Sequence, residues 1–247
     1  MYRFFVEPLA LCGENIFVEG SDYNHIKNVL RIKTNEEVSV VINGDDKEYR
    51  CHVEKYEEDR AVLKICLIKE NDAELANKIY LFQCLPKADK MELIIQKAVE
   101  LGVFEIIPVA SKRAVVKLDD KKAQSKIARW NSVSEAAAKQ AKRAVIPKVK
   151  MPMKFKEALN YCKDMDIKIL PYELCSNEAM DKTRELFSNI KSGESIAVFI
   201  GPEGGFDDEE ALAATESGFN TVTLGKRILR TETAGMTVLS WLVYLLE

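Results

Sequence analysis

Two glycine-bearing loops dominate the chemistry of this 247-residue chain: Ile200-Gly201-Pro202-Glu203-Gly204-Gly205-Phe206 and Leu224-Gly225-Lys226-Arg227-Ile228-Leu229-Arg230-Thr231-Glu232-Thr233-Ala234. Each loop begins where a short apolar run ends, at residues 196–200 and 221–224. Such runs are typical of buried parallel strands, and a predicted helix follows each of them. Ligands of open α/β sheets bind outside the carboxyl ends of the strands. We therefore expect both loops to open on one ligand-binding edge.

The rest of the second part of the chain alternates between strand and helix patterns. Predicted strands cover 79–85, 105–109, 167–170, 196–200 and 221–224, and predicted helices cover 89–101, 121–143, 155–162, 177–187, 207–217 and 234–246. Alternation at this spacing is typical of an α/β domain with a largely parallel sheet. The last helix is apolar nearly all round and too short to cross a bilayer, which favours burial in a core or a subunit interface.

The first 70 residues follow a different pattern. Short strand-like runs flank Asn43-Gly44-Asp45-Asp46, a turn sequence typical of a hairpin. A short helix is expected after Asp22, which can act as its N-cap. We predict a small β-barrel over 1–70, a polar linker at 70–78 and an α/β domain over 74–247, so that the fold class is α/β, and α+β overall.

The composition is that of a folded, cytoplasmic protein. Hydrophobic residues make up 47% and charged residues 30%, and the start of the chain lacks the apolar run of a signal peptide. We expect no membrane role. The cysteines are Cys12, Cys51, Cys66, Cys84, Cys162 and Cys175, without C-x-x-C spacing, and only two histidines occur. These spacings favour reduced thiols and no metal site.

The net charge is −3, but it is unevenly distributed along the chain. Residues 112–154 form a basic stretch that contains thirteen Lys or Arg residues and only three acidic ones. An ordinary solvated helix is one interpretation of such a run. An excess this one-sided also predicts a polyanionic partner such as a nucleic acid.

The loops lack the signatures of phosphate binding. No G-x-G sequence occurs, and the Gly225-Lys226 pair lacks the other positions of a P-loop. Asp207 and Glu210 can cap the helix after the first loop, and acidic residues there would repel a phosphate. S-adenosylmethionine, which is phosphate-free and carries a sulfonium and an ammonium, suits this entrance. A turn that needs glycine for its geometry alone would have the same first loop.

Three cations follow the second strand exit: Lys226, Arg227 and Arg230. Positive charge opposite an adenosyl pocket indicates that the second substrate is anionic.

These motifs together resemble one family. The sequences GPEGGF (201–206), LGKRILRTETA (224–234), ELIIQKAVELG (92–102) and EAAAKQAKRAVIP (135–147), with Arg3-Phe4-Phe5-Val6 and the stretch from His25 to Arg31, are similar to those of the RsmE ribosomal RNA methyltransferases. The resemblance covers nearly the whole chain. It implies a PUA-like β-barrel, a SPOUT methyltransferase domain with a carboxyl-terminal trefoil knot, and a homodimer. It also implies methylation of N3 of one uridine in 16S rRNA of the small ribosomal subunit, with S-adenosylmethionine as cofactor.

The resemblance also implies site residues. The cofactor-binding set is Leu170, Pro171, Ile200, Gly201, Pro202, Glu203, Gly204, Gly205, Leu224, Gly225, Ile228, Leu229 and Arg230. The RNA-binding set is Arg31, Arg113, Lys139, Gln140 and Arg143. Uridine N3 is a poor nucleophile while protonated, so we expect Arg230 to stabilise negative charge on the uracil and Glu232 or a water to take the proton. Alternatively, Arg230 and Glu232 pair with each other or cap the helix.

Three other functions stay open from the residues alone. A noncatalytic RNA-binding or assembly factor would use the barrel and the basic helix and leave the pocket empty. An adenine-nucleotide enzyme is disfavoured by the missing phosphate motifs. A SPOUT methyltransferase acting on another RNA, or on a ribose hydroxyl, would have similar loops.

Overall fold

The computed structural model describes residues 1–114, 120–172 and 180–247, with the backbone alone at 120–122. Cys175 and the predicted helix start at 177–179 lie outside these ranges. The chain forms two compact units. The first contains Met1–Glu74 and Ala138–Val145, and the second contains Leu75–Ala137 and Ile146–Glu247. The segment Ala138–Val145 thus groups with the first unit, although it is flanked on both sides by the second.

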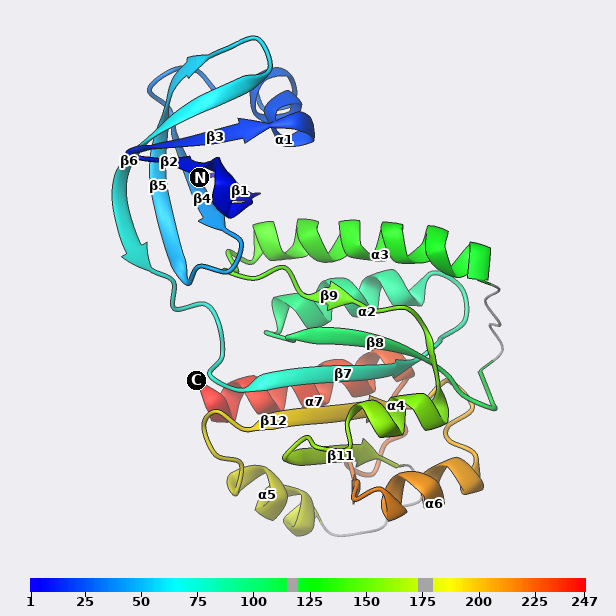
Figure 1. The fold of residues 1–247 in the computed structure, drawn as a ribbon. Helices are drawn as coiled ribbons and strands as arrows, with labels where there is room; N and C mark the ends of the chain where they lie inside the picture. Colours follow the sequence, from blue (N-terminus) through cyan, green and yellow to red (C-terminus); the bar gives the residue numbers. More distant parts are fainter. Residues whose placement is uncertain (115–119, 173–179) are drawn as a thin grey trace. The chain divides into compact units, whose positions relative to one another are not determined.

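The first unit is a curled six-stranded sheet in the order β1-β4-β5-β6-β3-β2 (Figure 1). Its elements are β1 (Arg3–Val6), η1 (Pro8–Ala10), β2 (Leu11–Cys12), β3 (Asn15–Glu19), α1 (Gly20–Asn24), η2 (His25–Val29), β4 (Glu37–Ile42), β5 (Lys47–Tyr56) and β6 (Arg60–Glu70). Strand β1 runs parallel to β4, and the other pairs are antiparallel. Alternate side chains, among them Phe4, Ile16 and Val40, fill its core.

The short helix of this unit begins earlier than predicted. Asp22 was expected as the N-cap, but α1 starts at Gly20 and the N-cap is Glu19. Gly20, with a φ of 60°, turns the chain into the helix directly after β3. Asp22 lies inside the first turn instead, where its carboxylate accepts a hydrogen bond from Lys139 at 3.1 Å.

The second unit is the predicted parallel α/β domain, with strand order β10-β8-β7-β12-β11-β13 and β9 beside β8. Its strands are β7 (Lys78–Cys84), β8 (Glu105–Ala110), β9 (Lys148–Val149), β10 (Met153–Lys154), β11 (Ile167–Pro171), β12 (Ser195–Ile200) and β13 (Asn220–Val222). Its helices are α2 (Lys90–Glu100), α3 (Asp120–Gln140), α4 (Phe155–Tyr161), α5 (Met180–Ser188), α6 (Asp208–Glu216) and α7 (Thr231–Leu246). All strand pairs are parallel.

Two helix ends differ by three residues from the sequence prediction, and two short strands were not predicted. Helix α3 ends at Gln140 instead of residue 143, since Lys142 takes a φ of 58° that a helix cannot continue. Helix α7 begins at Thr231 instead of 234. Strands β9 and β10 were not predicted because two residues are too few to show a period.

Aromatic rings hold the core of the second unit. Phe82 stacks on Phe199 with 5.3 Å between ring centroids, and Phe155, Phe206 and Phe219 surround Phe199. Helix α4 lies in front of the sheet and α7 behind it (Figure 1). Phe206 comes from the first glycine-bearing loop, so this core fixes the position of that loop.

None of the helices in the described ranges has both the length and the apolar character needed to cross a bilayer. Within the same residues, no three His, Cys, Asp or Glu side chains are grouped to hold a metal ion. Cys12, Cys51, Cys66, Cys84 and Cys162 are free thiols, and burial raises the pKa of Cys51 to about 12. The trefoil knot stays a prediction.

Candidate functional site

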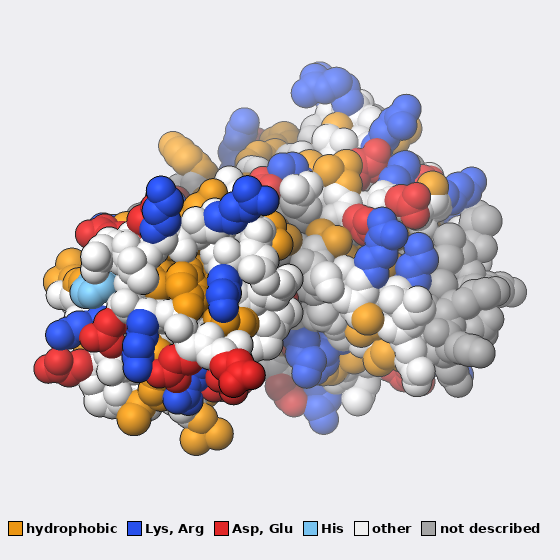
Figure 2. Space-filling model, turned by 90° about the horizontal axis from the view of Figure 1, so that it is seen from above, with side chains coloured by type: hydrophobic (Ala, Val, Ile, Leu, Met, Phe, Trp, Pro, Cys, Tyr) orange, Lys and Arg blue, Asp and Glu red, His pale blue; other side chains and the backbone are white. Residues whose placement is uncertain are grey.

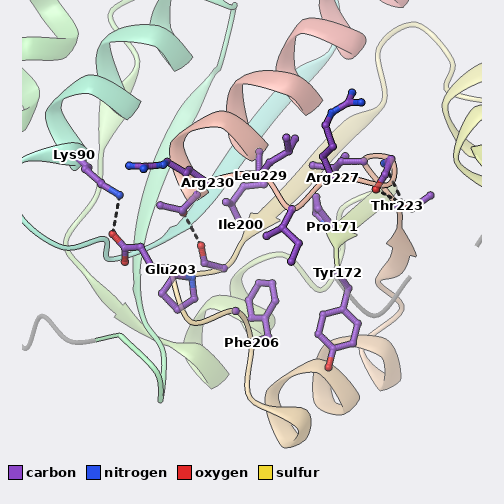
Figure 3. Close-up of a pocket in the computed structure, with 18 residues that line it drawn as sticks. Lys90, Pro171, Tyr172, Ile200, Glu203, Phe206, Thr223, Arg227, Leu229 and Arg230 are labelled. Atoms are coloured by element: carbon purple, nitrogen blue, oxygen red, sulfur yellow. Dashed lines mark hydrogen bonds and ion pairs between the residues drawn. The ribbon is translucent and has the colours of Figure 1, made fainter. Parts of the chain in front are cut away.

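The two glycine-bearing loops open at the same edge of the parallel sheet. Strands β12 and β13 both pair with β11 in parallel, so their carboxyl ends lie at the same edge of the sheet, on either side of β11. A cavity of about 350 Å³ lies there, within the size range of small-molecule sites (Figure 3). It is lined by Lys90, Pro171, Tyr172, Ile200, Gly201, Pro202, Glu203, Gly205, Phe206, Thr223, Leu224, Gly225, Arg227, Ile228, Leu229, Arg230, Thr231 and Ala234. The expectation of one shared edge is confirmed.

Most residues of the predicted cofactor set line this cavity. They are Pro171, Ile200, Gly201, Pro202, Glu203, Gly205, Leu224, Gly225, Ile228, Leu229 and Arg230. Two others lie elsewhere. Leu170 is fully buried in the hydrophobic core, and the carbonyl oxygen of Gly204 accepts a hydrogen bond from Arg113 at 3.2 Å.

The first loop is fixed by a close approach between backbone and ring. A Cβ added at Gly201 would lie 3.2 Å from the ring of Phe206, tighter than ordinary contact. Phe206 itself is 3% exposed and packs on Phe155 and Phe199. The loop therefore has little freedom where it borders the cavity.

The helix after this loop is capped by its own side chains. Asp207 and Glu210 form the predicted capping box of α6, and Asp208 and Glu209 add negative charge to its first turn. Lys112 pairs with Asp207 at 3.2 Å, and its hydrogen bond lowers the pKa of Asp207. Carboxylates thus already occupy the N-terminus of α6, and their negative charge opposes phosphate binding there.

The second loop turns at Gly225, which has a φ of 103°. Side chains other than glycine rarely adopt this conformation. The N–H of Gly225 donates to Oγ1 of Thr223 at 3.1 Å, and Thr223 bonds in turn to Thr183 of α5. Beyond the turn, Ile228 is 82% exposed at the mouth of the cavity.

A chain of hydrogen bonds joins the two loops at the base of the cavity. Oγ1 of Thr231 donates to the carbonyl oxygen of Gly201 at 2.6 Å. Nε2 of the fully buried Gln83 donates to the same Oγ1 at 2.9 Å. The first turn of α7 is thereby bound to the exit of β12 and to β7.

Charged groups join the loops at the rim. Nζ of Lys90 lies 3.2 Å from a carboxylate oxygen of Glu203 (Figure 3). The same Nζ lies 3.2 Å from a carboxylate oxygen of Glu232. Glu203 also accepts from the backbone N–H of Lys87 at 3.0 Å. Burial alone would raise the pKa of Glu203, but the hydrogen bonds from backbone N–H groups and from Lys90 outweigh it and lower that pKa. Bonding to Glu203 raises the pKa of Lys90.

The two residues predicted to be catalytic do not pair with each other. Glu232 is paired with Lys90. Arg230 is exposed, precedes α7 as its N-cap residue and has no side-chain partner among the described residues. In Figure 3 its guanidinium extends toward the side of the cavity where Lys90 and Glu203 lie. The alternative of an Arg230–Glu232 pair is therefore not observed.

The residues predicted to bind RNA occupy different settings. Arg31 is exposed and takes a φ of 53°, and Gln140 is exposed at the end of α3. Arg113 lies over the backbone of Gly204 beside the first loop. Lys139 pairs with Asp22 at 3.1 Å.

Arg143 differs from the others because its side chain is buried. It is 3% exposed, and its guanidinium bonds to both carboxylate oxygens of Glu74, at 3.1 Å for the Nε contact. The same carboxylate accepts from the N–H of Ala144 at 2.9 Å. An RNA contact by Arg143 stays a prediction, and this pairing indicates a structural role.

Much of the basic stretch is neutralised locally. Its paired cations are Lys112 with Asp207 and Glu209, Arg113 with Asp207, Lys126 with Asp89, Arg129 with Glu92, Lys139 with Asp22, Arg143 with Glu74 and Lys150 with Glu105. Figure 2 shows Lys and Arg side chains scattered between acidic and apolar ones on one face. The excess of Lys and Arg over acidic residues within 112–154 is thus larger than the number of these cations that lack an acidic partner elsewhere in the chain.

Several lining residues were missed as site residues: Lys90, Tyr172, Phe206, Thr223, Arg227, Thr231 and Ala234. Most belong to the two quoted loops or adjoin them. Lys90 and Tyr172 follow β7 and β11 instead. The sheet topology could have predicted both residues, because every strand of a parallel sheet ends at the same edge and residues that follow β7 and β11 therefore lie near the two loops.

Comparison with known proteins identifies the family. Residues 73–243 match the RNA methyltransferase domain model, and residues 18–66 match the RNA methyltransferase PUA domain model. The chain is 34% identical to the ribosomal RNA small subunit methyltransferase E of Bacillus subtilis, over 100% of this chain and 98% of that one. The chain belongs to the RsmE family. Its PUA-like curled sheet and its α/β domain are those of this family.

Two similar solved structures have S-adenosylmethionine bound. The enzyme of Neisseria gonorrhoeae, bound to S-adenosylmethionine, matches with a TM-score of 0.84 and 31% identity, covering 99% of this chain and 98% of that one. A methyltransferase of Legionella pneumophila, also in complex with S-adenosylmethionine, matches with a TM-score of 0.84 and 30% identity, covering 98% and 96%.

Proposed function

We propose that this protein transfers the methyl group of S-adenosylmethionine to N3 of a uridine in the 16S rRNA of the small ribosomal subunit. The observation that supports this most is the cavity formed by two strand exits at one sheet edge. Relatives of the same family with the same fold bind S-adenosylmethionine or have names that place their activity on small subunit rRNA. The proposed cofactor residues are those of the predicted set that line the cavity, apart from Glu203, whose carboxylate is paired with Lys90.

The residues present fit this cofactor. The lining is largely apolar, with Ile200, Leu224 and Leu229 beside accessible backbone at Gly201 and Gly225. A Cβ at Gly225 would stand in open space, so ligand atoms can approach that backbone. The capped and acidic N-terminus of α6 disfavours a phosphorylated nucleotide.

When bound, S-adenosylmethionine supplies an electrophilic methyl group on a sulfonium. The side chains of this protein then have three tasks: holding the base in line, removing the N3 proton and stabilising the anion. We assign anion stabilisation to Arg230, whose charge has no partner among the described residues. We assign proton removal to Glu232 or to a water beside it.

RNA binding is assigned to exposed polar side chains. Arg31, Arg113 and Gln140 are exposed, and Lys139 is partly exposed. The target base must be unpaired or flipped, because N3 lies on the Watson–Crick edge. If these cations contact phosphates, RNA affinity falls steeply as salt is added.

The assembly is proposed to be a cytoplasmic homodimer with a trefoil knot in the second domain. Exposed apolar side chains on α7 support an interface there, since Tyr244 is 85% and Leu245 47% exposed. Size-exclusion chromatography with light scattering tests the dimer.

Mass mapping of rRNA from cells lacking the protein tests the reaction. One methyl group is expected to disappear from a uridine of 16S rRNA, and the purified protein should restore it. Loss of a methyl from another RNA would assign a different substrate. Unchanged rRNA, with no binding of S-adenosylmethionine by calorimetry, would support a noncatalytic RNA-binding factor.

A further inference from the structure

Lys90 lies between the two loops although it belongs to neither. It is the first residue of α2, which follows β7. Its ammonium contacts Glu203 of the first loop and Glu232 of α7, each at 3.2 Å. Both carboxylates are mostly buried, with side-chain exposures of 25% and 15%.

Without this cation the rim of the cavity would hold two carboxylates facing one site. Like charges in partly buried positions repel each other, and the repulsion would push the first loop away from α7. The backbone N–H of Lys87 also donates to Glu203 at 3.0 Å. The segment from Lys87 to Lys90 therefore contacts Glu203 twice and Glu232 once.

We infer that Lys90 is a positioning residue that holds the two loops in the relative position needed to bind the cofactor. This inference rests on the proposed function. It assigns Glu203 to the bridge and not to a direct contact with the cofactor, because its carboxylate is already occupied by Lys90 and by the N–H of Lys87.

The test compares Lys90→Met, which keeps the length of the side chain without its charge, with Lys90→Arg. The matched control is Lys97→Met on the same helix, whose ammonium pairs with Glu100 at 2.8 Å and does not line the cavity. Binding of S-adenosylhomocysteine is measured by calorimetry, and KM is measured separately for S-adenosylmethionine and for RNA.

Lys90→Met is expected to weaken S-adenosylhomocysteine binding about tenfold, equivalent to about 1.4 kcal/mol. KM for S-adenosylmethionine should rise by a similar factor while KM for RNA stays unchanged. Lys90→Arg should restore most of the affinity, and Lys97→Met should bind normally. A purely structural role would lower the unfolding midpoint without separating the two KM values.

A double-mutant cycle tests the bridge itself. Glu203→Gln should weaken binding, and adding it to Lys90→Met should weaken binding no further. Additive losses, or normal binding by Lys90→Met, would overturn the inference. If the unaltered protein failed to bind S-adenosylhomocysteine at all, the proposed function would fail instead.

Discussion

The hydroxyl of Thr231 donates a hydrogen bond to the carbonyl oxygen of Gly201 across 2.6 Å. This contact spans thirty residues of sequence and joins the first turn of α7 to the exit of β12. Thr231 is 5% exposed, so water cannot easily replace the bond. The shape of the cavity at its base therefore depends on one hydroxyl group.

Thr231→Val keeps the shape of the side chain but removes this donor. It removes the donor to the carbonyl of Gly201 and the acceptor of one of the two hydrogen bonds that Nε2 of Gln83 donates, the other being to the carbonyl oxygen of Cys84. We expect the free energy of unfolding to fall by about 1–3 kcal/mol, the cost of unsatisfied buried groups, and cofactor affinity to fall with it. Urea denaturation and calorimetry measure both. Thr237→Val, at a half-buried site on the same helix whose hydroxyl bonds to the carbonyl of Thr233, is the control and should change cofactor affinity little.

Gly225→Ala introduces backbone strain without a steric clash. The φ of Gly225 is 103°, and an added Cβ would meet nothing within 4 Å. We expect a loss of about 1–3 kcal/mol of stability and weaker cofactor binding, because the second loop must distort. Gly193→Ala provides a matched strain at a φ of 86°, also in open space but away from the cavity. It should lose stability and keep its affinity; equal effects on affinity would contradict a specific role for Gly225.

Arg230→Ala should leave the stability unchanged, since the side chain is exposed. We expect kcat at saturating RNA to fall by about 10²–10³, the usual effect of removing one group that stabilises developing negative charge. Lys226→Ala removes a cation from the same loop that does not line the cavity, and it should retain its kcat. Normal turnover by Arg230→Ala would show that this assignment is wrong.

Arg143→Ala should act on the fold and not on RNA contacts. Removal of the guanidinium breaks a buried pair with Glu74, and we expect a loss of about 3 kcal/mol, at the low end for buried pairs because Glu74 is partly exposed. The exposed Gln140→Ala should be nearly neutral for stability. If Arg143→Ala kept its stability but reduced the salt dependence of RNA binding, the RNA role would hold instead.

The pair of Lys112 and Asp207 gives a pH dependence. The pKa of Asp207 is lowered by Lys112, so its contribution to stability is present above about pH 4 and is lost as pH falls through the lowered pKa. The pKa of Lys112 is raised by Glu209 and Asp207, so its contribution is lost only as pH rises beyond about 10.4. The difference in stability between the unaltered protein and Lys112→Ala should be constant from about pH 5 to 9 and shrink below pH 4.

Urea denaturation as a function of pH measures this difference. Lys156→Ala, at an exposed site on α4, is the control and should show no such dependence. A difference that grew on acidification would have the wrong sign for an ion pair with Asp207.

The sequence predicted the parallel domain and most of the cavity because local patterns determine both. Apolar runs that end in glycine located the loops at Gly201 and Gly225, and the capping box at Asp207 followed from spacing alone. Lys90 could not be found in this way, since its role depends on contacts with residues more than one hundred positions away.

The ion pairs of the basic stretch could not be predicted, for a different reason. A sequence shows how many cations a stretch contains but not where their counterions lie. Asp22, Glu74 and Glu105 pair with Lys139, Arg143 and Lys150 across long sequence separations. The predicted basic stretch therefore has less free charge than its composition indicates.

The return of Ala138–Val145 to the first unit constrains the order in which a nascent chain can fold. The buried guanidinium of Arg3 donates to the carbonyl oxygens of Lys142 and Arg143, at 2.9 Å for the latter, so the amino-terminal sheet lacks part of its packing until residue 145 has emerged during translation. By then residues 75–137 of the second unit have already been synthesised. The amino-terminal unit is therefore expected to complete its packing only after this part of the second unit has been made, unlike a protein whose domains fold one after another from the amino terminus.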